Sequence, residues 1–198
     1  VGSEMCIRDR FLHSHILWFY TLAALDYVNP LNALKANVGS AYDLVEAAGT
    51  SCQSDLKALQ ERLTKFAENG QLSIFSGNWW KNGQSDTEFK LPAELDLIAT
   101  AHYIEALTMQ SKASEVCALL GGKMPHVMTI VPGGTSFVPT EEKLDDLWSL
   151  VHELRDWIKA TIIPDTKAIA PYYKEALSFG KGLSLIHISE PTRLGMIS

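Results

Sequence analysis

The segment LPAELDLIATAHYIEALTMQSKASEVCALLGG, residues 91–122, decides the fold. Between Pro92 and Gly121 it contains neither proline nor glycine, the two residues that most disfavour the interior of a helix. A proline is tolerated in the first turn of a helix, and a glycine beyond the last turn ends one. The segment therefore predicts one long helix from about residue 92 to about residue 120.

The segment between this helix and residue 140 is rich in proline and glycine. The segment MPHVMTIVPGGTSFVP, residues 124–139, contains prolines that remove backbone donors and a Gly-Gly pair that favours turns. These residues cannot be helical, so we predict a long ordered loop, in which Ile130-Val131 can form a short strand.

Two more helices are predicted beyond the loop. Thr140 can cap the first, and the acidic run from Glu141 to Asp146 is the solvated start of that helix. Its apolar positions recur at helical spacing: Leu144, Leu147, Val151, Leu154 and Ile158. Pro164 is predicted to end it, and a last helix is predicted over residues 165–179.

Residues 11–48 indicate two helices before the long one. Residues 11–28 are nearly all apolar and stop at Asn29-Pro30, which predicts a helix buried on most of its sides. Residues 31–48 predict a second helix closed by Gly49, although Gly39 weakens its middle.

A further helix and a loop complete the region before the long helix. Ser54 can cap the helix, which ends at Gly70 and carries Leu56, Leu59, Leu63 and Phe66 on one face. Residues 71–91 are predicted as an ordered loop. The fold class is therefore mainly α: a bundle of about six helices with one long ordered Gly/Pro-rich loop and room for short strands.

The two ends of the chain are predicted not to be natural protein. VGSEMCIRD followed by the start of Arg10 can be encoded by a DNA string whose reverse complement encodes LSLIHISEPT, which is residues 183–192. Both ends can thus be opposite strands of one element, which resembles a sequencing-library adapter. We therefore assign residues 1–10 and 183–198 to adapter-derived tails and residues 11–182 to the protein proper.

Composition excludes several classes of protein. The formal net charge is −6, without the basic stripe of a nucleic-acid-binding protein. No run of about 18 apolar residues is free of charge, so membrane association is expected only through a partner. The cysteines, Cys6, Cys52 and Cys117, form no C-x-x-C pair, which argues against a zinc site or disulfide framework. Reduced thiols favour a cytoplasmic location or the inner face of a membrane.

GGKMPHVMTIVPGG, residues 121–134, is the most informative segment for function. Long ordered loops of this kind are usually functional or interfacial, but the residues alone favour the simpler interpretation, a helix C-cap followed by a crossover loop. Lys123 could bind a phosphate, although the spacing is not that of a P-loop and no strand precedes it.

Five segments in order resemble the large subunit of nickel–iron hydrogenases. GGKMPH followed by VPGG is similar to the central loop of that family, and four other segments agree with its flanks. They are SHILWFYTLAALDYV (14–28), QLSIFSGNWW (71–80), LPAELDLIATAHYIEAL (91–107) and PDTKAIAPYY (164–173). The resemblance covers nearly all of residues 11–182. Trp18 and Thr21 stand where family members often have histidine, and Met124 stands where some members have it.

The resemblance implies heterolytic cleavage of dihydrogen at a nickel–iron centre held by two C-x-x-C pairs. Soft thiolates suit these metals. Neither pair is present here, since Cys52 and Cys117 lie 65 residues apart and are most simply buried structural thiols. No residue is therefore assigned as catalytic or as a metal ligand, and the chain alone is predicted to bind no metal and to be inactive.

The resemblance also implies a partner, an iron–sulfur small subunit that receives the electrons. The central loop would face it, so His126 and Lys123 are candidates for this interface, and His126 could tune a cluster potential. His126 could equally tie the loop to its own backbone. His15 is a third candidate, beside the active-site region, with a core histidine as the simpler interpretation.

Other residues have plainer interpretations. His102 and Glu105 share a helix face, as in some carboxylate-bridged metal sites, but a solvated or interfacial hydrogen bond is the better interpretation. Four tryptophans, Trp79, Trp80, Trp148 and Trp157, are predicted to pack in the core or at a subunit interface. Two alternatives to a hydrogenase stay open: a metal-free relative of the quinone-oxidoreductase subunit type, and a helical binding module.

Overall fold

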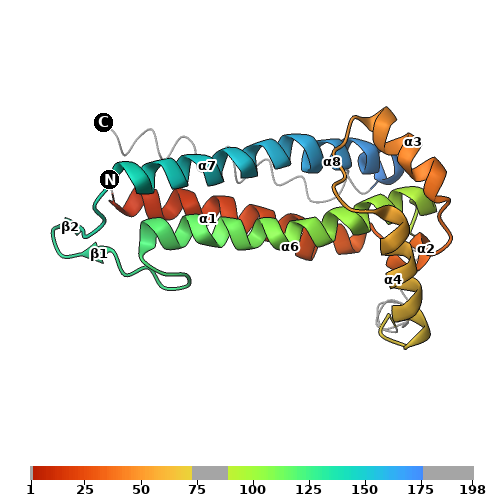
Figure 1. The fold of residues 1–198 in the computed structure, drawn as a ribbon, viewed down its shortest axis with the longest axis horizontal. Helices are drawn as coiled ribbons and strands as arrows, with labels where there is room; N and C mark the ends of the chain where they lie inside the picture. Colours follow the sequence, from red (N-terminus) through yellow and green to blue (C-terminus); the bar gives the residue numbers. More distant parts are fainter. Residues whose placement is uncertain (1, 73–88, 176–198) are drawn as a thin grey trace.

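The computed structural model describes residues 2–72 and 89–175, and the side chains from residue 10 onward. Its centre is helix α6, Ala93–Gly121, which begins after Pro92 and ends where Gly122 adopts a left-handed conformation. Helices α1 (Gly2–Trp18) and α7 (Glu141–Trp157) pack along α6 (Figure 1). The fold is mainly α, and the long helix has the bounds that its flanking proline and glycines predict.

The predicted helix 11–28 is present but continues through two irregular turns. α1 is followed by a π-helical turn, Phe19–Ala23 (η1), and a 3-10 turn, Ala24–Asp26 (η2). Towards the N-terminus, α1 extends back to Gly2, so residues 2–10 of the predicted tail are helical. Adding residues to an existing helix costs little compared with starting one, so this segment can be helical without packing.

The predicted helix 31–48 is two helices, α2 (Pro30–Ala33) and α3 (Val38–Ala48). The break is at Asn37, whose side chain accepts a hydrogen bond from the Ser40 backbone N–H and so caps a new helix. Gly49 ends α3 in a left-handed conformation, as predicted.

Helix α4 spans Leu56–Glu68, and Asp55 is its cap in place of Ser54. The Asp55 carboxylate accepts from the backbone N–H groups of Lys57 and Ala58, which explains the difference. The predicted loop 71–91 lies mostly outside the described residues, and so do Trp79 and Trp80.

The loop after α6 contains a small antiparallel hairpin, with β1 (Ile130–Val131) at the predicted position and β2 (Gly134–Thr135) beside it. Thr140 then caps α7 as predicted, by accepting a hydrogen bond from the Lys143 backbone N–H. The side chains from Glu141 to Asp146 are exposed, in agreement with a solvated helix start.

Pro164 does not end the helix that contains it, which corrects our prediction. α7 continues through a π-helical turn, Ile158–Ile162 (η3), into α8 (Ile163–Ile169) and a final 3-10 turn, Ala170–Tyr173 (η4). A proline within a helix leaves the carbonyl four residues earlier without its partner. That carbonyl belongs to Ala160, and it accepts instead from the Ser51 backbone N–H at 3.0 Å and the Thr50 hydroxyl at 3.1 Å.

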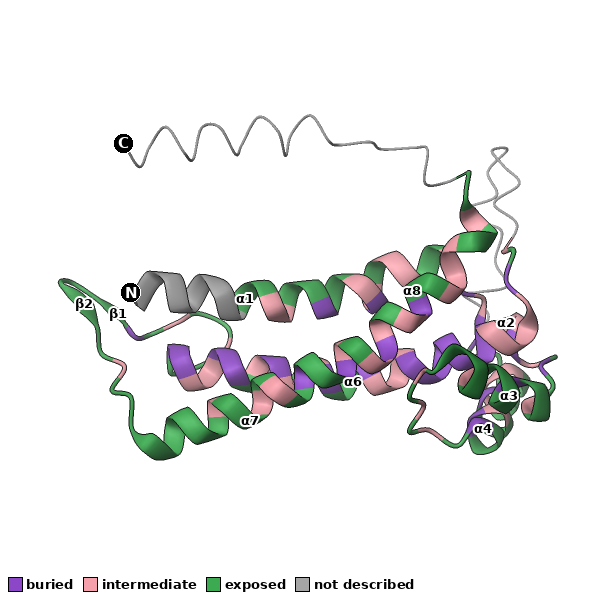
Figure 2. Ribbon diagram, turned by 90° about the horizontal axis from the view of Figure 1, so that it is seen from above, coloured by how far each residue is buried: buried purple, intermediate pink, exposed green. Residues whose placement is uncertain are grey.

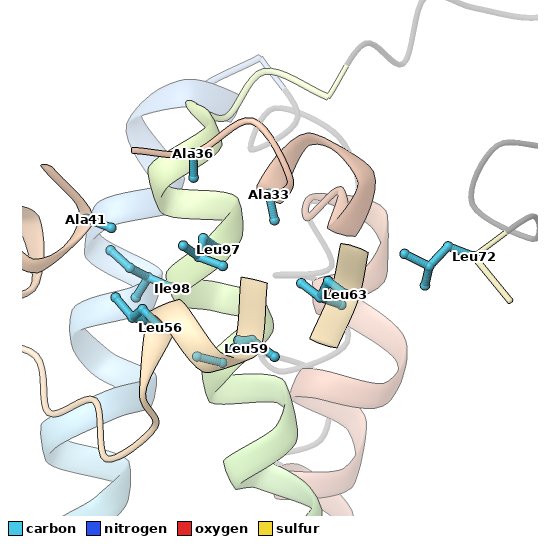
Figure 3. Packing of buried hydrophobic residues seen from close by; sticks show 10 residues of the cluster. Ala33, Ala36, Ala41, Leu56, Leu59, Leu63, Leu72, Leu97 and Ile98 are labelled. Atoms are coloured by element: carbon cyan, nitrogen blue, oxygen red, sulfur yellow. The ribbon is translucent and has the colours of Figure 1, made fainter. Parts of the chain in front are cut away.

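The apolar core has two main parts along α6. At its N-terminal end, Leu97 and Ile98 of α6 pack with Leu56 and Leu59 of α4 (Figure 3). Nearer the middle, a second cluster joins α6 to α1 and α7: Ile16, Tyr20, Ala106, Met109, Ala113, Val116, Leu154 and Trp157. Buried residues therefore concentrate along α6, while much of α7 is exposed (Figure 2).

One burial prediction was wrong, and the predicted positions of the tryptophans are distinguished. Ile16 and Tyr20 are 1% exposed, but Trp18 is 55% and Leu22 63% exposed, so the helix from Phe11 onward is buried on one side only. Trp157 packs in the core, whereas Trp148 is 69% exposed and stacks on His152 instead. Among the described helices, none is long and apolar enough to span a bilayer.

Candidate functional site

The loop candidates Lys123 and His126 are both exposed and lie just beyond the C-terminus of α6. The Met124-Pro125 peptide bond between them is cis, and His126 has a positive φ of 64°. The loop therefore presents a cationic side chain and an imidazole to solvent within four residues of each other.

This loop is fixed against the end of α6 by three contacts. The Met128 backbone N–H donates to the Gly121 carbonyl at 2.7 Å, and the Thr129 hydroxyl donates to the Leu120 carbonyl at 3.0 Å. A Cβ on Gly121 would lie 3.0 Å from the Val127 side chain, so glycine favours this close approach. Lys123 and His126 are therefore displayed by an anchored segment.

His15, the third candidate, lies on α1 and is exposed. Its Nδ1 is 2.7 Å from the Phe11 carbonyl, one helical turn earlier, and its ring meets the Phe11 ring edge-on. It borders an apolar hollow of about 220 Å³ between α1 and the helix that follows α7. No hydrogen bond or ion pair in the described part of the chain joins His15 to Lys123 or His126, so the three candidates do not form one site.

One polar cluster in the core was not predicted from the sequence. His102 of α6 is fully buried, and its Nδ1 donates to Asp165 of α8 at 2.8 Å. The hydroxyl of Tyr20, from η1, donates to the same carboxylate at 2.8 Å. One carboxylate thus joins three helical segments that are far apart in sequence.

Burial and the charge of Asp165 have opposite effects on the pKa of His102 in this cluster. Burial disfavours the charged imidazolium of His102, but interactions with Asp165 and Cys52 outweigh this effect and raise the pKa of His102 to about 10. Burial, together with the negative charge and hydrogen bond of Asp165, raises the pKa of the Tyr20 hydroxyl above its ordinary value. His102 is therefore a cation paired with Asp165 at neutral pH.

Glu105 does not pair with His102, although both lie on one face of α6. Its Oε1 accepts from the backbone N–H of Gln53 at 2.8 Å and from the backbone N–H and hydroxyl of Ser54, each at 3.0 Å. The solvated or interfacial interpretation was thus wrong for His102, because Asp165 neutralises it in the core. The sequence signal was weak: Asp165 lies 63 residues from His102.

Two buried atoms of this region have no hydrogen-bond partner, Nε2 of His102 and Oε2 of Glu105. The Cys52 thiol lies in the connection between α3 and α4 and is half-buried, while Cys117 on α6 is fully buried. Among the described residues, no group of three or more His, Cys, Asp and Glu side chains is arranged to hold a metal ion. The donor set seen here does not fit a nickel–iron centre.

Comparison with known proteins identifies the family. The family model described as nickel-dependent hydrogenase matches residues 3–193, and so reaches into both predicted tails. The uptake hydrogenase large subunit of Rhodobacter capsulatus is 37% identical over 187 residues, which cover 87% of this chain and 30% of that protein. The hydrogenase-2 large chain of Escherichia coli K12 is 35% identical over 181 residues, which cover 86% of this chain and 31% of that protein.

A solved structure agrees with these relatives. The structure of the Ni-Fe-Se hydrogenase from D. vulgaris Hildenborough superposes on this chain with a TM-score of 0.59 and 25% sequence identity. The superposed region covers 88% of this chain and 27% of the hydrogenase chain. This chain thus spans about three tenths of the length of the relatives that it matches. The match over residues 3–193 and the shared helical fold place the chain in the nickel-dependent hydrogenase family.

Proposed function

We propose that this chain is an internal part of the large subunit of a nickel–iron hydrogenase. The parent enzyme would split dihydrogen reversibly and pass the electrons to an iron–sulfur small subunit. The observation that carries this proposal is the family match over residues 3–193, which includes the loop GGKMPHVMTIVPGG. Hydrogenase large subunits at 35–37% identity support it.

The metal centre is proposed to belong to parts of the parent subunit outside this chain. The residues described here offer no metal-binding cluster, and Cys52 and Cys117 are separated along the chain by 65 residues. The relatives are about three times as long as the matched region, which leaves room for the two C-x-x-C pairs. The nickel–iron centre would supply the site of dihydrogen cleavage, and we derive no step of it from this chain.

We further propose that the anchored loop faces the small subunit. Lys123 and His126 are exposed there, and so are the apolar side chains of Met128 and Ile130. Exposed apolar residues beside a cation are typical of subunit interfaces. His15 would face another part of the large subunit, since it borders an apolar hollow rather than the loop.

The location is proposed to be the cytoplasm or the inner face of a membrane, with membrane contact only through a partner. Three cysteines without a disulfide pattern support a reducing compartment. No nucleic acid is proposed as a partner, because the charge is acidic.

The test is to recover the flanking gene sequence and to express the complete subunit with its neighbouring small subunit. We expect one C-x-x-C pair upstream and one near the C-terminus, and reduction of a viologen dye that depends on dihydrogen. The 198-residue chain alone, as matched control, should give no such activity. A complete gene without either pair would contradict the proposal and favour a metal-free relative of the quinone-oxidoreductase subunit type. A gene that adds no further domain would favour a helical binding module.

A further inference from the structure

The hairpin that follows α6 has an edge with free backbone groups. Val131 faces Gly134 across a two-residue turn, where the two strands bond to each other in both directions. The next bond across the hairpin runs from the Ser136 backbone N–H to the Thr129 carbonyl at 2.8 Å. Backbone groups alternate in direction along an antiparallel strand, so the N–H and the carbonyl of Ile130, between these positions, point away from β2.

The free edge is that of β1. No hydrogen bond in the described part of the chain reaches the backbone of Ile130 from outside the hairpin. β2 lies beside α1, and the hairpin projects past the C-terminal end of α6 (Figure 1). The Met128 N–H is already bonded to the Gly121 carbonyl, so the free stretch is centred on Ile130. A strand added here would form two main-chain bonds with Ile130, one donated and one accepted by it.

This edge of β1 is apolar and carries no charge. Residues 127–139 contain no Asp, Glu, Lys, Arg or His. Met128 and Ile130, two residues apart and hence on one face of the strand, are 65% and 57% exposed. Natural proteins protect an exposed edge strand with charges, prolines, bulges or a covering segment. None of the first three occurs at Ile130, so a covering segment is the protection that remains.

We infer that the free edge of β1 binds an extended, uncharged segment of the partner subunit, which adds to the hairpin as a third strand. In strand addition, main-chain hydrogen bonds give affinity and alternate side chains give specificity. The chain holds the hairpin only at its base, through Met128 and Thr129, which leaves the edge at Ile130 free for another polypeptide. The identity of the partner rests on the proposed function, in which this loop faces the small subunit.

The experiment measures backbone hydrogen–deuterium exchange, resolved to single residues, on the complete large subunit alone and in complex with the small subunit encoded beside it. The Ile130 N–H should exchange more slowly in the complex by about 10-fold or more. The Val131 N–H is the internal control, because it is bonded within the hairpin and should be protected in both samples. Equal exchange of Ile130 in the two samples would overturn the inference, and so would a failure of the two subunits to associate.

Two substitutions at one position separate main-chain bonding from apolar contact. Ile130→Pro removes the outward N–H but none of the bonds within the hairpin, and should weaken subunit association about 10-fold, because a partner carbonyl loses its donor. Ile130→Thr is the matched control, since it keeps the N–H and suits a strand, and position 130 should stay protected in its complex. Equal association of the two variants would count against strand addition. If Val131 loses its protection in Ile130→Pro, the exchange data of the unchanged complex decide alone.

Failure of this inference can be told apart from failure of the proposed function. Dye reduction that depends on dihydrogen is measured on the same complex. An active complex in which Ile130 exchanges freely would overturn the strand addition and leave the hydrogenase assignment intact. An inactive complex in which Ile130 is protected only with the partner present would support the strand addition and contradict the proposed activity.

Discussion

Asp165 joins three helical segments in the core of this bundle. Its carboxylate accepts hydrogen bonds from Tyr20 and His102, and all three side chains are buried or nearly so. A buried ion pair stabilises little by itself, but the loss of one partner leaves an uncompensated charge in the core. The protonation of His102 should therefore be visible in the stability of the whole chain.

We predict that the free energy of unfolding falls as the pH rises from about 6.5 to about 10. The pKa of His102 is about 10 in the folded chain and about 6.5 when unfolded, so in this window only the folded state holds the proton. The stabilisation is complete below pH 6.5 and is lost above pH 10, a difference on the order of a few kcal/mol. Urea midpoints measured across this range check the prediction.

The His102→Gln variant is the control, since it lacks the titrating group and should lose most of the slope. Asp96 does not interfere, because burial raises its pKa only to about 6 and its effect lies below this window. The same slope in His102→Gln would show that another group causes it.

The sequence could not have predicted this cluster. His102 stood out only as a histidine on a helix face, and its partner Asp165 follows a proline that was expected to end a helix. The loop that carries Lys123 and His126 could be predicted, because the prolines and glycines around these residues exclude a helix on local grounds. Local rules apply to neighbours in sequence, whereas the cluster depends on packing between distant helices.

At the scale of elements, α6 determines the packing of the others. Leu97 is fully buried between α4 and the segment around Ala33, while Leu107 on the same helix is 47% exposed. We predict that Leu97→Ala destabilises the chain by about 2–5 kcal/mol, because it removes buried methyl groups and leaves a cavity.

Leu107→Ala makes the same chemical change at an exposed position of the same helix. Its effect should stay within about 0.5 kcal/mol. Chemical denaturation of both variants distinguishes them, and similar losses at the two positions would mean that α6 does not have the burial described here.

The element boundaries show which signals the sequence carries. Pro92, Gly122 and Thr140 act on their own neighbours, and the helix ends that they predict are observed. The break at Asn37 and the passage of the helix through Pro164 were missed. Both depend on which hydrogen-bond partner a residue finds after folding: Ser40 for Asn37, and the Thr50–Ser51 segment for the Ala160 carbonyl.

At the scale of the molecule, large apolar side chains remain uncovered. They lie on the helix from α1 to η2, on the loop and on α7: Phe11, Leu17, Trp18, Leu22, Leu25, Met128, Ile130, Leu144 and Trp148. Where such side chains form a contiguous patch, they are typical of a surface that a partner covers. The relatives contain more than twice as much additional chain as the region matched here.

We predict that the isolated chain binds a hydrophobic dye and aggregates as its concentration rises. Replacing Trp18 and Leu22 by glutamine should reduce both effects, because these side chains are 55% and 63% exposed. Dye fluorescence and light scattering measure the result. A monomer with cooperative unfolding and no dye binding would instead identify a complete domain.

We also predict that the purified chain holds no stoichiometric nickel or iron after reconstitution, because isolated histidines and thiols give weak sites. Elemental analysis after desalting measures this, with a zinc-finger protein as positive control for the reconstitution step. One tightly bound equivalent of nickel would show that the chain forms a metal site of its own.

The tail assignment stays a prediction, since residues 176–198 and the side chains of residues 1–9 lie outside what the structure describes. We expect a chain that lacks residues 183–198 to unfold at the same urea concentration as the full chain, because adapter-encoded residues were never selected to pack. A lower midpoint in the shortened chain would assign these residues to the fold.

The π-helical turn at Ile158–Ile162 has a consequence for how this protein can change during evolution. Such a turn holds one residue more than the α-helix around it and absorbs that residue locally, so the helical segments on its two sides keep nearly the same orientation. Loss of one residue from the turn can therefore be absorbed by its return to a regular α-helix. The same loss within α8 before Asp165, at Ile163 or Pro164, would instead rotate the carboxylate by about 100° around the helix axis and separate it from His102.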